Sequence, residues 1–139
     1  MIFLIGIGVI VMIIAGVYLR CRMLINETNR ENRQYEQYYQ KEISGTELGS
    51  LINKIVDTNI NNKIEKDETG RYKDNGENSI RMDIQFTDDD RIHTFEEIYN
   101  NDTGIFIQYY QQITFRCTKI EYHKQTGKVR YLYFEQIST

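Results

Sequence analysis

The stretch IFLIGIGVIVMIIAGVYL, residues 2–19, is an unbroken apolar run that Arg20 and Arg22 close on its C-terminal side. A helix of this length spans roughly 27 Å, close to the hydrocarbon thickness of a bilayer. No strongly polar residue interrupts the run, as one normally would in a core helix with a solvated edge. The run therefore predicts a transmembrane helix, and we assign residues 1–22 as the membrane anchor.

Two kinds of cleaved N-terminal segment fit these residues poorly. A signal peptide has basic residues before its apolar core and a small-x-small cleavage site after it, and the sequence shows neither feature. A lipoprotein requires a small residue before its modified cysteine, whereas Arg20 precedes Cys21. An uncleaved single-pass anchor in the cell membrane is therefore expected.

Basic residues predict the side of the membrane on which the rest of the chain lies. Arg20, Arg22, Arg30 and Arg33 all follow the apolar run closely, and no Lys or Arg precedes it. Because basic residues near a membrane span stay on the cytoplasmic side, the soluble part is expected in the cytoplasm. Lysines upstream of the run would reverse that expectation.

Composition excludes some classes of partner. The chain carries 17 Lys and Arg against 20 Asp and Glu, a net charge of −3, with no basic stripe. A mildly acidic domain of this kind is a poor nucleic-acid binder. Cys21 belongs to the membrane surface and Cys117 to a predicted strand, so the two cysteines predict no disulfide framework. Cys21 is either an idle thiol or a palmitoylation site.

Residues 23–42 predict a juxtamembrane stalk helix. The segment is polar, lacks Gly and Pro, and places Tyr35, Tyr38 and Tyr39 at helical spacing. We expect this tyrosine stripe to dock on the soluble domain. No apolar heptad persists in the stalk and no GxxxG pair lies in the anchor, so self-association is unsupported and the oligomeric state stays open.

The soluble domain, residues 43–139, opens with the clearest amphipathic helix in the chain. Ser44 and Glu47 match a capping box at its start. The apolar residues that share one helical face are Leu48, Leu51, Ile52, Ile55, Val56 and Ile60. This face requires a sheet or a second helix to cover it.

Alternating patterns further along predict the strands of that sheet. Residues 80–86 alternate apolar and polar side chains, and residues 113–122 and 128–137 flank a turn in which Gly127 supplies a left-handed conformation. Residues 63–79 contain two turn signals and predict a small hairpin arm with a short strand at 71–73.

Two short helices are predicted between these strands. Thr94 and Glu97 form a second capping box. After a break, residues 105–112 predict a helix whose inward residues are Ile105, Phe106, Tyr109 and Tyr110. The expected fold is therefore α+β, with a small antiparallel sheet packed against the amphipathic helix.

Candidate chemistry is sparse. The acidic triplet at residues 88–90 lacks the alternating ligands and distal Glu of a calcium loop, so it predicts a solvated turn. Cys117 and His123 on one extended strand would lie roughly 20 Å apart, too far to share a metal ion. His93 has no partner identifiable from spacing. We therefore predict no catalytic, cofactor-binding or metal-binding residue, and no enzymatic activity.

Three phrases carry a resemblance: EISGTELGSLINKIVDTN (residues 42–59), IRMDIQF (80–86) and FRCTKIEYHKQTGKVRYLYFEQI (115–137). They resemble a group of small membrane-anchored proteins of low-GC Gram-positive bacteria. The resemblance implies an anchored domain and no particular activity. Members often carry basic residues before the apolar run, which would place the domain outside the cell, and this chain lacks them.

The layout of anchor, polar helix and sheet-containing head also resembles a type IV pilin. Cleavage after Gly6 or Gly8 would leave Val11 or Ile13 where a pilin has an acidic residue. Three functions therefore stand as expectations. The first is a non-enzymatic accessory or interaction protein of the cell envelope with an unidentified protein partner. The alternatives are a pilin-like subunit of a filament or secretion apparatus, and an enzyme.

Overall fold

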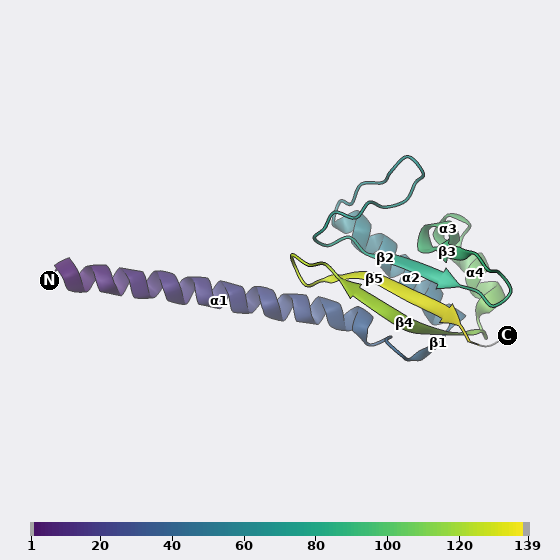
Figure 1. Cartoon of the computed structure of the whole chain (residues 1–139), viewed down its shortest axis with the longest axis horizontal. Coiled ribbons are helices and arrows are strands. Elements are labelled where there is room, and N and C mark those ends of the chain that lie inside the picture. Colours follow the sequence, from purple (N-terminus) through teal and green to yellow (C-terminus); the bar gives the residue numbers. More distant parts are fainter. Residues whose placement is uncertain (1, 138–139) are drawn as a thin grey trace.

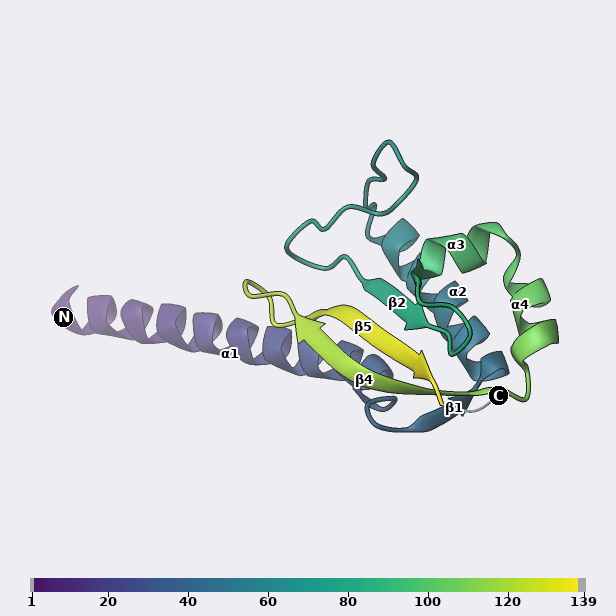
Figure 2. The same ribbon diagram turned by 45° about the vertical axis from the view of Figure 1, so that its right-hand side comes forward.

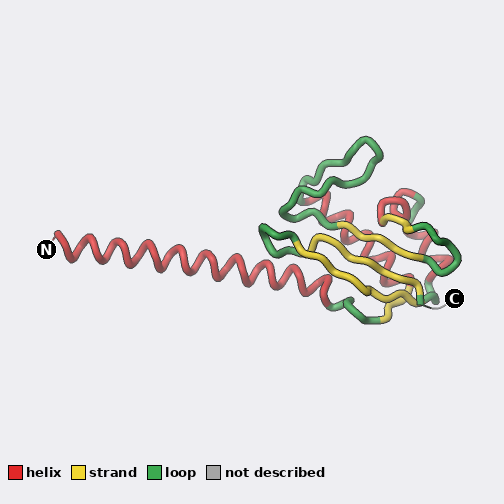
Figure 3. The backbone as a smooth tube through the Cα atoms, in the orientation of Figure 1, coloured by secondary structure: helices red, strands yellow, loops and turns green. Residues whose placement is uncertain are grey.

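The apolar run forms the first part of one continuous helix, α1 (Ile2–Glu36), which projects from the rest of the chain (Figures 1 and 3). The computed structural model describes residues 2–137. The most apolar part of α1 is entirely unburied, and the helix is long and apolar enough to cross a membrane. Its apolar surface continues past the two arginines through Met23, Leu24 and Ile25, all exposed. A core helix would bury these side chains against the protein.

The stalk helix is shorter than expected. Helix α1 ends at Glu36, so the prediction of helix through residue 42 was wrong for the last part of that segment. Gln40 takes a positive φ of 61°, and its N–H donates to the carbonyl oxygen of Cys117 at 2.9 Å. Pairing with a distant strand therefore replaces the local preference of these residues for helix.

The head contains a five-stranded sheet in the order β1-β4-β5-β2-β3. The strands are β1 (Glu42–Ser44), β2 (Arg81–Gln85), β3 (Ile92–Thr94), β4 (Thr114–Tyr122) and β5 (Val129–Gln136). Strands β4 and β5 form the predicted antiparallel hairpin, with Gly127 at a φ of 74°. Strand β2 pairs with β5 in parallel, so the α+β fold is confirmed while the sheet is mixed rather than antiparallel.

Helix α2 (Gly45–Asn61) covers one face of this sheet (Figure 2). The Ser44 hydroxyl accepts a hydrogen bond from the Glu47 N–H at 3.2 Å, as the capping pattern predicted. The predicted inward residues are buried with one exception, because Ile60 is 56% exposed. Asn59 lies inside instead, where its amide donates to the Ile80 carbonyl and accepts from the Ile80 N–H. A polar side chain suits this position because it meets backbone groups just before β2 begins.

Two short helices, α3 (Phe95–Asn100) and α4 (Thr103–Tyr110), lie at the end of the head away from the free part of α1 (Figures 1 and 2). The Thr94 cap of α3 is confirmed, because its hydroxyl accepts from the Glu97 N–H. Helix α4 buries Phe106, whereas Ile105 and Tyr109 are 50% and 76% exposed, so their predicted inward positions were wrong. Helix α4 packs mainly on α2 rather than on the sheet, so a different face of α4 is buried from the one that was predicted.

The arm at residues 63–79 is tied down by one aromatic residue. It contains a single bridge, between Lys66 and Tyr72, in place of the predicted short strand. Tyr72 is buried against Phe95, and its N–H donates to the Glu96 carboxylate at 2.7 Å. Although it lacks regular pairing, the arm is thus attached to α3 at its centre.

Burial makes Cys117 chemically inert in the folded head. Its side chain has no exposed surface, and burial raises the pKa of its thiol to about 11. At pH 8 roughly one thiol in a thousand is then the reactive thiolate. In a Cys21→Ser variant we expect a maleimide to leave the native chain unlabelled and to label it after unfolding, measured by intact mass. Full labelling of the native chain within minutes would contradict this burial.

Candidate functional site

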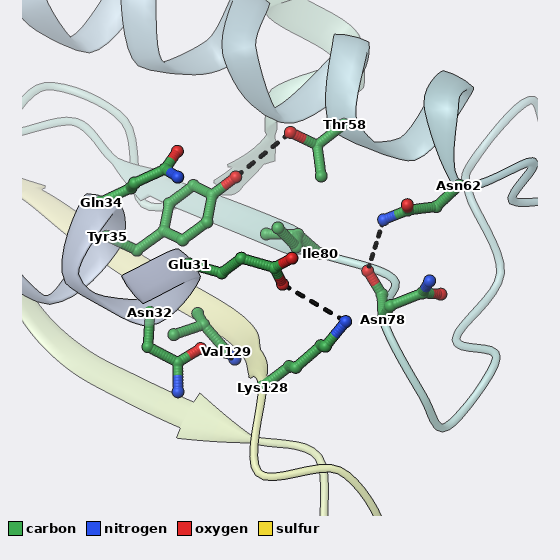
Figure 4. Close-up of a pocket in the computed structure, with 10 residues that line it drawn as sticks. All are labelled: Glu31, Asn32, Gln34, Tyr35, Thr58, Asn62, Asn78, Ile80, Lys128 and Val129. Atoms are coloured by element: carbon green, nitrogen blue, oxygen red, sulfur yellow. Dashed lines mark hydrogen bonds and ion pairs between the residues drawn. The ribbon is translucent and has the colours of Figure 1, made fainter. Parts of the chain in front are cut away.

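The last turns of α1 are joined to the head by side-chain contacts (Figure 4). Asn32 donates to the Gly127 carbonyl at 2.9 Å and accepts from the Val129 N–H at 3.0 Å. Tyr35 is buried and hydrogen-bonds the Thr58 hydroxyl of α2 at 3.2 Å. These contacts hold α1 to both the β4–β5 turn and α2.

A small cavity of about 200 Å³ lies at this joint. Several of its polar side chains already bind one another: Lys128 pairs with Glu31 at 3.3 Å, and Asn62 donates to the Asn78 carbonyl. The joint therefore reads as a structural connection rather than a ligand site. The predicted docking of the tyrosine stripe holds for Tyr35 and for the partly buried Tyr38, while Tyr39 is 49% exposed.

A larger cavity of about 500 Å³, here called the distal pocket, lies at the opposite end of the head beside α3 and α4. Apolar side chains and an excess of acidic ones share its lining. The residues that line it are Phe86, Asp88, Asp89, Arg91, His93, Glu97, Ile98, Asn101, Asp102, Ile105, Phe106, Tyr109 and Tyr110. Its volume falls within the range of ordinary binding pockets.

The apolar part of the distal pocket rests on an aromatic cluster. The Phe86 ring lies 5.1 Å from the Tyr110 ring and 6.4 Å from the Phe106 ring, centroid to centroid. Aromatic pairs at these separations attract one another and resist rearrangement. Ile105 and Tyr109 extend this apolar surface into solvent from the open side of α4. Removing that surface from water would be favourable.

The charged part of the pocket is acidic. Four lining carboxylates face a single arginine, Arg91, which pairs with Glu97 at 3.4 Å. Asp102 caps α4 by accepting from the Gly104 N–H at 2.8 Å. Asp88 is exposed and makes no hydrogen bond or ion pair within residues 2–137. Burial, with a smaller contribution from the Asp88 charge, raises the pKa of the Tyr110 phenol.

His93 stands between two of these carboxylates. Its Nε2 lies 2.8 Å from Asp89 Oδ2 and its Nδ1 lies 3.1 Å from Glu97 Oε2. Hydrogen bonds from the Arg91 N–H and then from His93 lower the pKa of Asp89, so that carboxylate is ionised at neutral pH. Both ring nitrogens of His93 are therefore in hydrogen-bond contact with neighbouring carboxylates.

Sequence reasoning left His93 without a partner. The spacing of four residues on each side, Asp89 to His93 to Glu97, was the available signal. It was difficult to use because the three residues lie in a loop, a strand and a helix, and only the turn from β3 into α3 brings them together. The acidic triplet otherwise behaves as predicted, since Asp89 accepts from the Arg91 N–H within the turn.

Possible metal ligands do not converge in the part of the chain that the structure describes. Among those residues, no group of three or more His, Cys, Asp or Glu is arranged to hold a metal ion. At His93 the two carboxylates bind opposite ring nitrogens, so they cannot share one ion with it. His123 is buried and donates from Nε2 to the Ser79 carbonyl at 2.7 Å.

Comparisons with protein-family models, with curated proteins and with solved structures give no match for this chain. The functional argument therefore starts from two features of the molecule itself. One is the exposed apolar helix whose last turns contact the head, and the other is the distal pocket.

Proposed function

We propose that this chain is a single-pass membrane protein of the cell envelope whose head is a non-enzymatic interaction module. The observation that carries the proposal is the distal pocket, an open and partly apolar cavity at the end of the head opposite to an unburied apolar helix. An exposed apolar patch with polar residues around it is typical of a surface that binds another protein.

The lining of the distal pocket favours binding over chemistry. No Ser, Thr, Cys or Lys is among its lining residues, so it offers no aliphatic hydroxyl, thiol or amine nucleophile. The only imidazole in it, His93, is engaged at both nitrogens. By contrast, Ile105 and Tyr109 present apolar surface to solvent, with exposed fractions of 50% and 76%.

The joint between α1 and the head determines how far the head stands from the membrane. From Arg22, the end of the predicted anchor, to Asn32 in the joint, α1 rises only about 15 Å. With residues up to Arg22 at the membrane, the head would stand close to the membrane surface. The distal pocket would then face the aqueous phase, where a protein partner can reach it.

Photocrosslinking in cells tests the proposal. A photoreactive phenylalanine at Tyr109 is expected to give one discrete heavier adduct, because that side chain borders the pocket and is largely exposed. The same probe at Ile60, exposed on the far part of α2, serves as the matched control. Identical adduct patterns at both positions, or none at Tyr109, would overturn the proposal.

The proposed side of the membrane is the cytoplasm, supported by the arginines that follow the apolar run. A Gln125→Cys change in the exposed β4–β5 turn, combined with Cys21→Ser, provides an accessible thiol. The buried Cys117 does not interfere. A membrane-impermeant thiol reagent is expected to leave whole cells unlabelled and to label lysed cells. Labelling of whole cells would place the head outside.

A pilin-like subunit is the second candidate function. The continuity of α1 favours it, because the exposed apolar part and the last turns, which pack on the head, belong to one unbroken helix. Such a subunit would be processed at a glycine near its N-terminus and would form polymers that shearing releases. A membrane-extracted chain with Met1 intact, measured by mass spectrometry, would remove this candidate.

A further inference from the structure

We infer that the distal pocket binds a segment of a partner protein in which an apolar side chain is flanked by lysine or arginine. This inference rests on the proposed function, because it specifies the chemistry of the partner that the module takes. Its basis is the combination, in one cavity, of uncovered apolar surface on α4 and of carboxylates that outnumber the cations.

The apolar side chain of the partner has a defined place. Phe86 and Phe106 line the pocket and are buried, whereas Tyr109 lines it with most of its surface exposed. An aliphatic or aromatic side chain entering here would remove apolar surface of Ile105 and Tyr109 from water, and these residues would bury the entering side chain. Buried anchors of this kind contribute much of the affinity of protein interfaces.

The flanking cations follow from charge complementarity. Asp88 is exposed and has no hydrogen-bond or ion-pair partner among residues 2–137, so its carboxylate is available to a ligand. Asp89 is held in the ionised form by its hydrogen bonds to the Arg91 N–H and His93. Lysine or arginine side chains would meet these carboxylates at the rim, whereas an acidic segment would be repelled.

Other occupants fit less well. Anionic lipid and nucleic acid carry the same sign of charge as the rim. The chain has its own basic and apolar segment, residues 20–25 (RCRMLI), but it lies on α1, at the other end of the head from the pocket (Figure 1). A second copy standing upright in the same bilayer would hold that segment at the membrane, away from the pocket.

The test uses the full chain in phosphatidylcholine nanodiscs, with empty nanodiscs as background. The probe is a fluorescent peptide in which Leu and Phe are flanked by two arginines on each side, compared with a peptide carrying glutamates instead. Fluorescence anisotropy is expected to show binding of the arginine peptide, weakened as salt rises, and none of the glutamate peptide.

Matched variants locate the binding. Asp88→Lys is expected to weaken the arginine peptide roughly tenfold, because it reverses a rim charge, while Asp90→Lys beside it, outside the pocket lining, changes affinity much less. Tyr109→Ser is expected to cost about tenfold, and Tyr99→Ser, exposed on α3 outside the lining, little. All four positions are exposed, so each variant retains the fold.

Equal binding of the two peptides, or equal effects of the Asp88 and Asp90 changes, would overturn the inference. If the Tyr109 crosslink persists in cells while the arginine peptide fails to bind, the interaction function stands and the stated partner chemistry is wrong. If the adduct has the mass of two copies of this chain, the occupant is a second copy and the inference also fails. If neither the Tyr109 crosslink nor binding of the arginine peptide is observed, the proposed interaction function is itself overturned.

Discussion

Replacing Ile10 and Ile13 together with arginine is expected to move most of the chain from the membrane pellet into the detergent-free supernatant. Both residues lie in the exposed part of α1 near the middle of the apolar run. A single arginine at the centre of a membrane helix costs about 2.5–3.5 kcal/mol of insertion free energy, so the pair costs roughly 5–7 kcal/mol. The fold of the head is unaffected because neither side chain is buried in it.

The measurement is the distribution of the variant after ultracentrifugation of lysed cells, detected by immunoblot. The matched control is the double change Ile10→Leu and Ile13→Leu, which keeps both positions apolar and should sediment with the membranes as the parent chain does. An arginine variant that sediments like the parent would mean that this part of α1 does not lie in lipid.

Gly45→Ala is expected to destabilise the head by about 3 kcal/mol or more and to lower its Tm by on the order of 15 °C. A Cβ at this position would clash with the backbone carbonyl oxygen of Tyr110, at the end of α4. That atom belongs to the backbone, so relief of the clash requires α2 and α4 to separate. The close approach of these two helices depends on this glycine.

Two further variants grade the effect, with thermal unfolding followed by circular dichroism. At Gly49 a Cβ would meet the side chain of Ile107 at 2.6 Å, which can swing aside, so Gly49→Ala should cost less. Ser50→Ala changes an exposed position of the same helix and should leave the Tm almost unchanged. Equal Tm values for Gly45→Ala and Ser50→Ala would refute the packing described for α2 and α4.

Features set by short-range patterns were predictable from the sequence. The caps at Ser44 and Thr94 depend on residues three positions apart, and both form as expected. The inward face of α2 follows from helical periodicity, and the β4–β5 hairpin from alternation around Gly127. In each of these cases the signal and the structure lie within one stretch of chain.

Features set by distant contacts were not predictable. Strands β1 and β3 have three residues each, too few to show alternation. The parallel pairing of β2 with β5 leaves no trace in either strand's own pattern, because a strand alternates in the same way beside either kind of neighbour. Helix α1 ends at Glu36 for the same reason, since the pairing partner of the next residues is β4.

The distal pocket was likewise not predictable from the sequence, because distant contacts form it. Its residues come from the segment between β2 and β3, from β3 itself, and from both short helices and the turn between them. Predicting it required knowing that α4 packs on α2, which turns Ile105 and Tyr109 outward instead of inward. No motif marks it, because apolar surface and charge carry the proposed recognition rather than a fixed catalytic spacing.

The most direct test of the account is whether the intact chain enters a bilayer through α1. The purified full-length protein is reconstituted into liposomes, floated on a density gradient and then digested with protease. We predict that it floats with the lipid and keeps a protected N-terminal fragment that contains residues 2–19. Recovery of the intact chain at the bottom of the gradient as a soluble protein, with no protected fragment, would contradict the account.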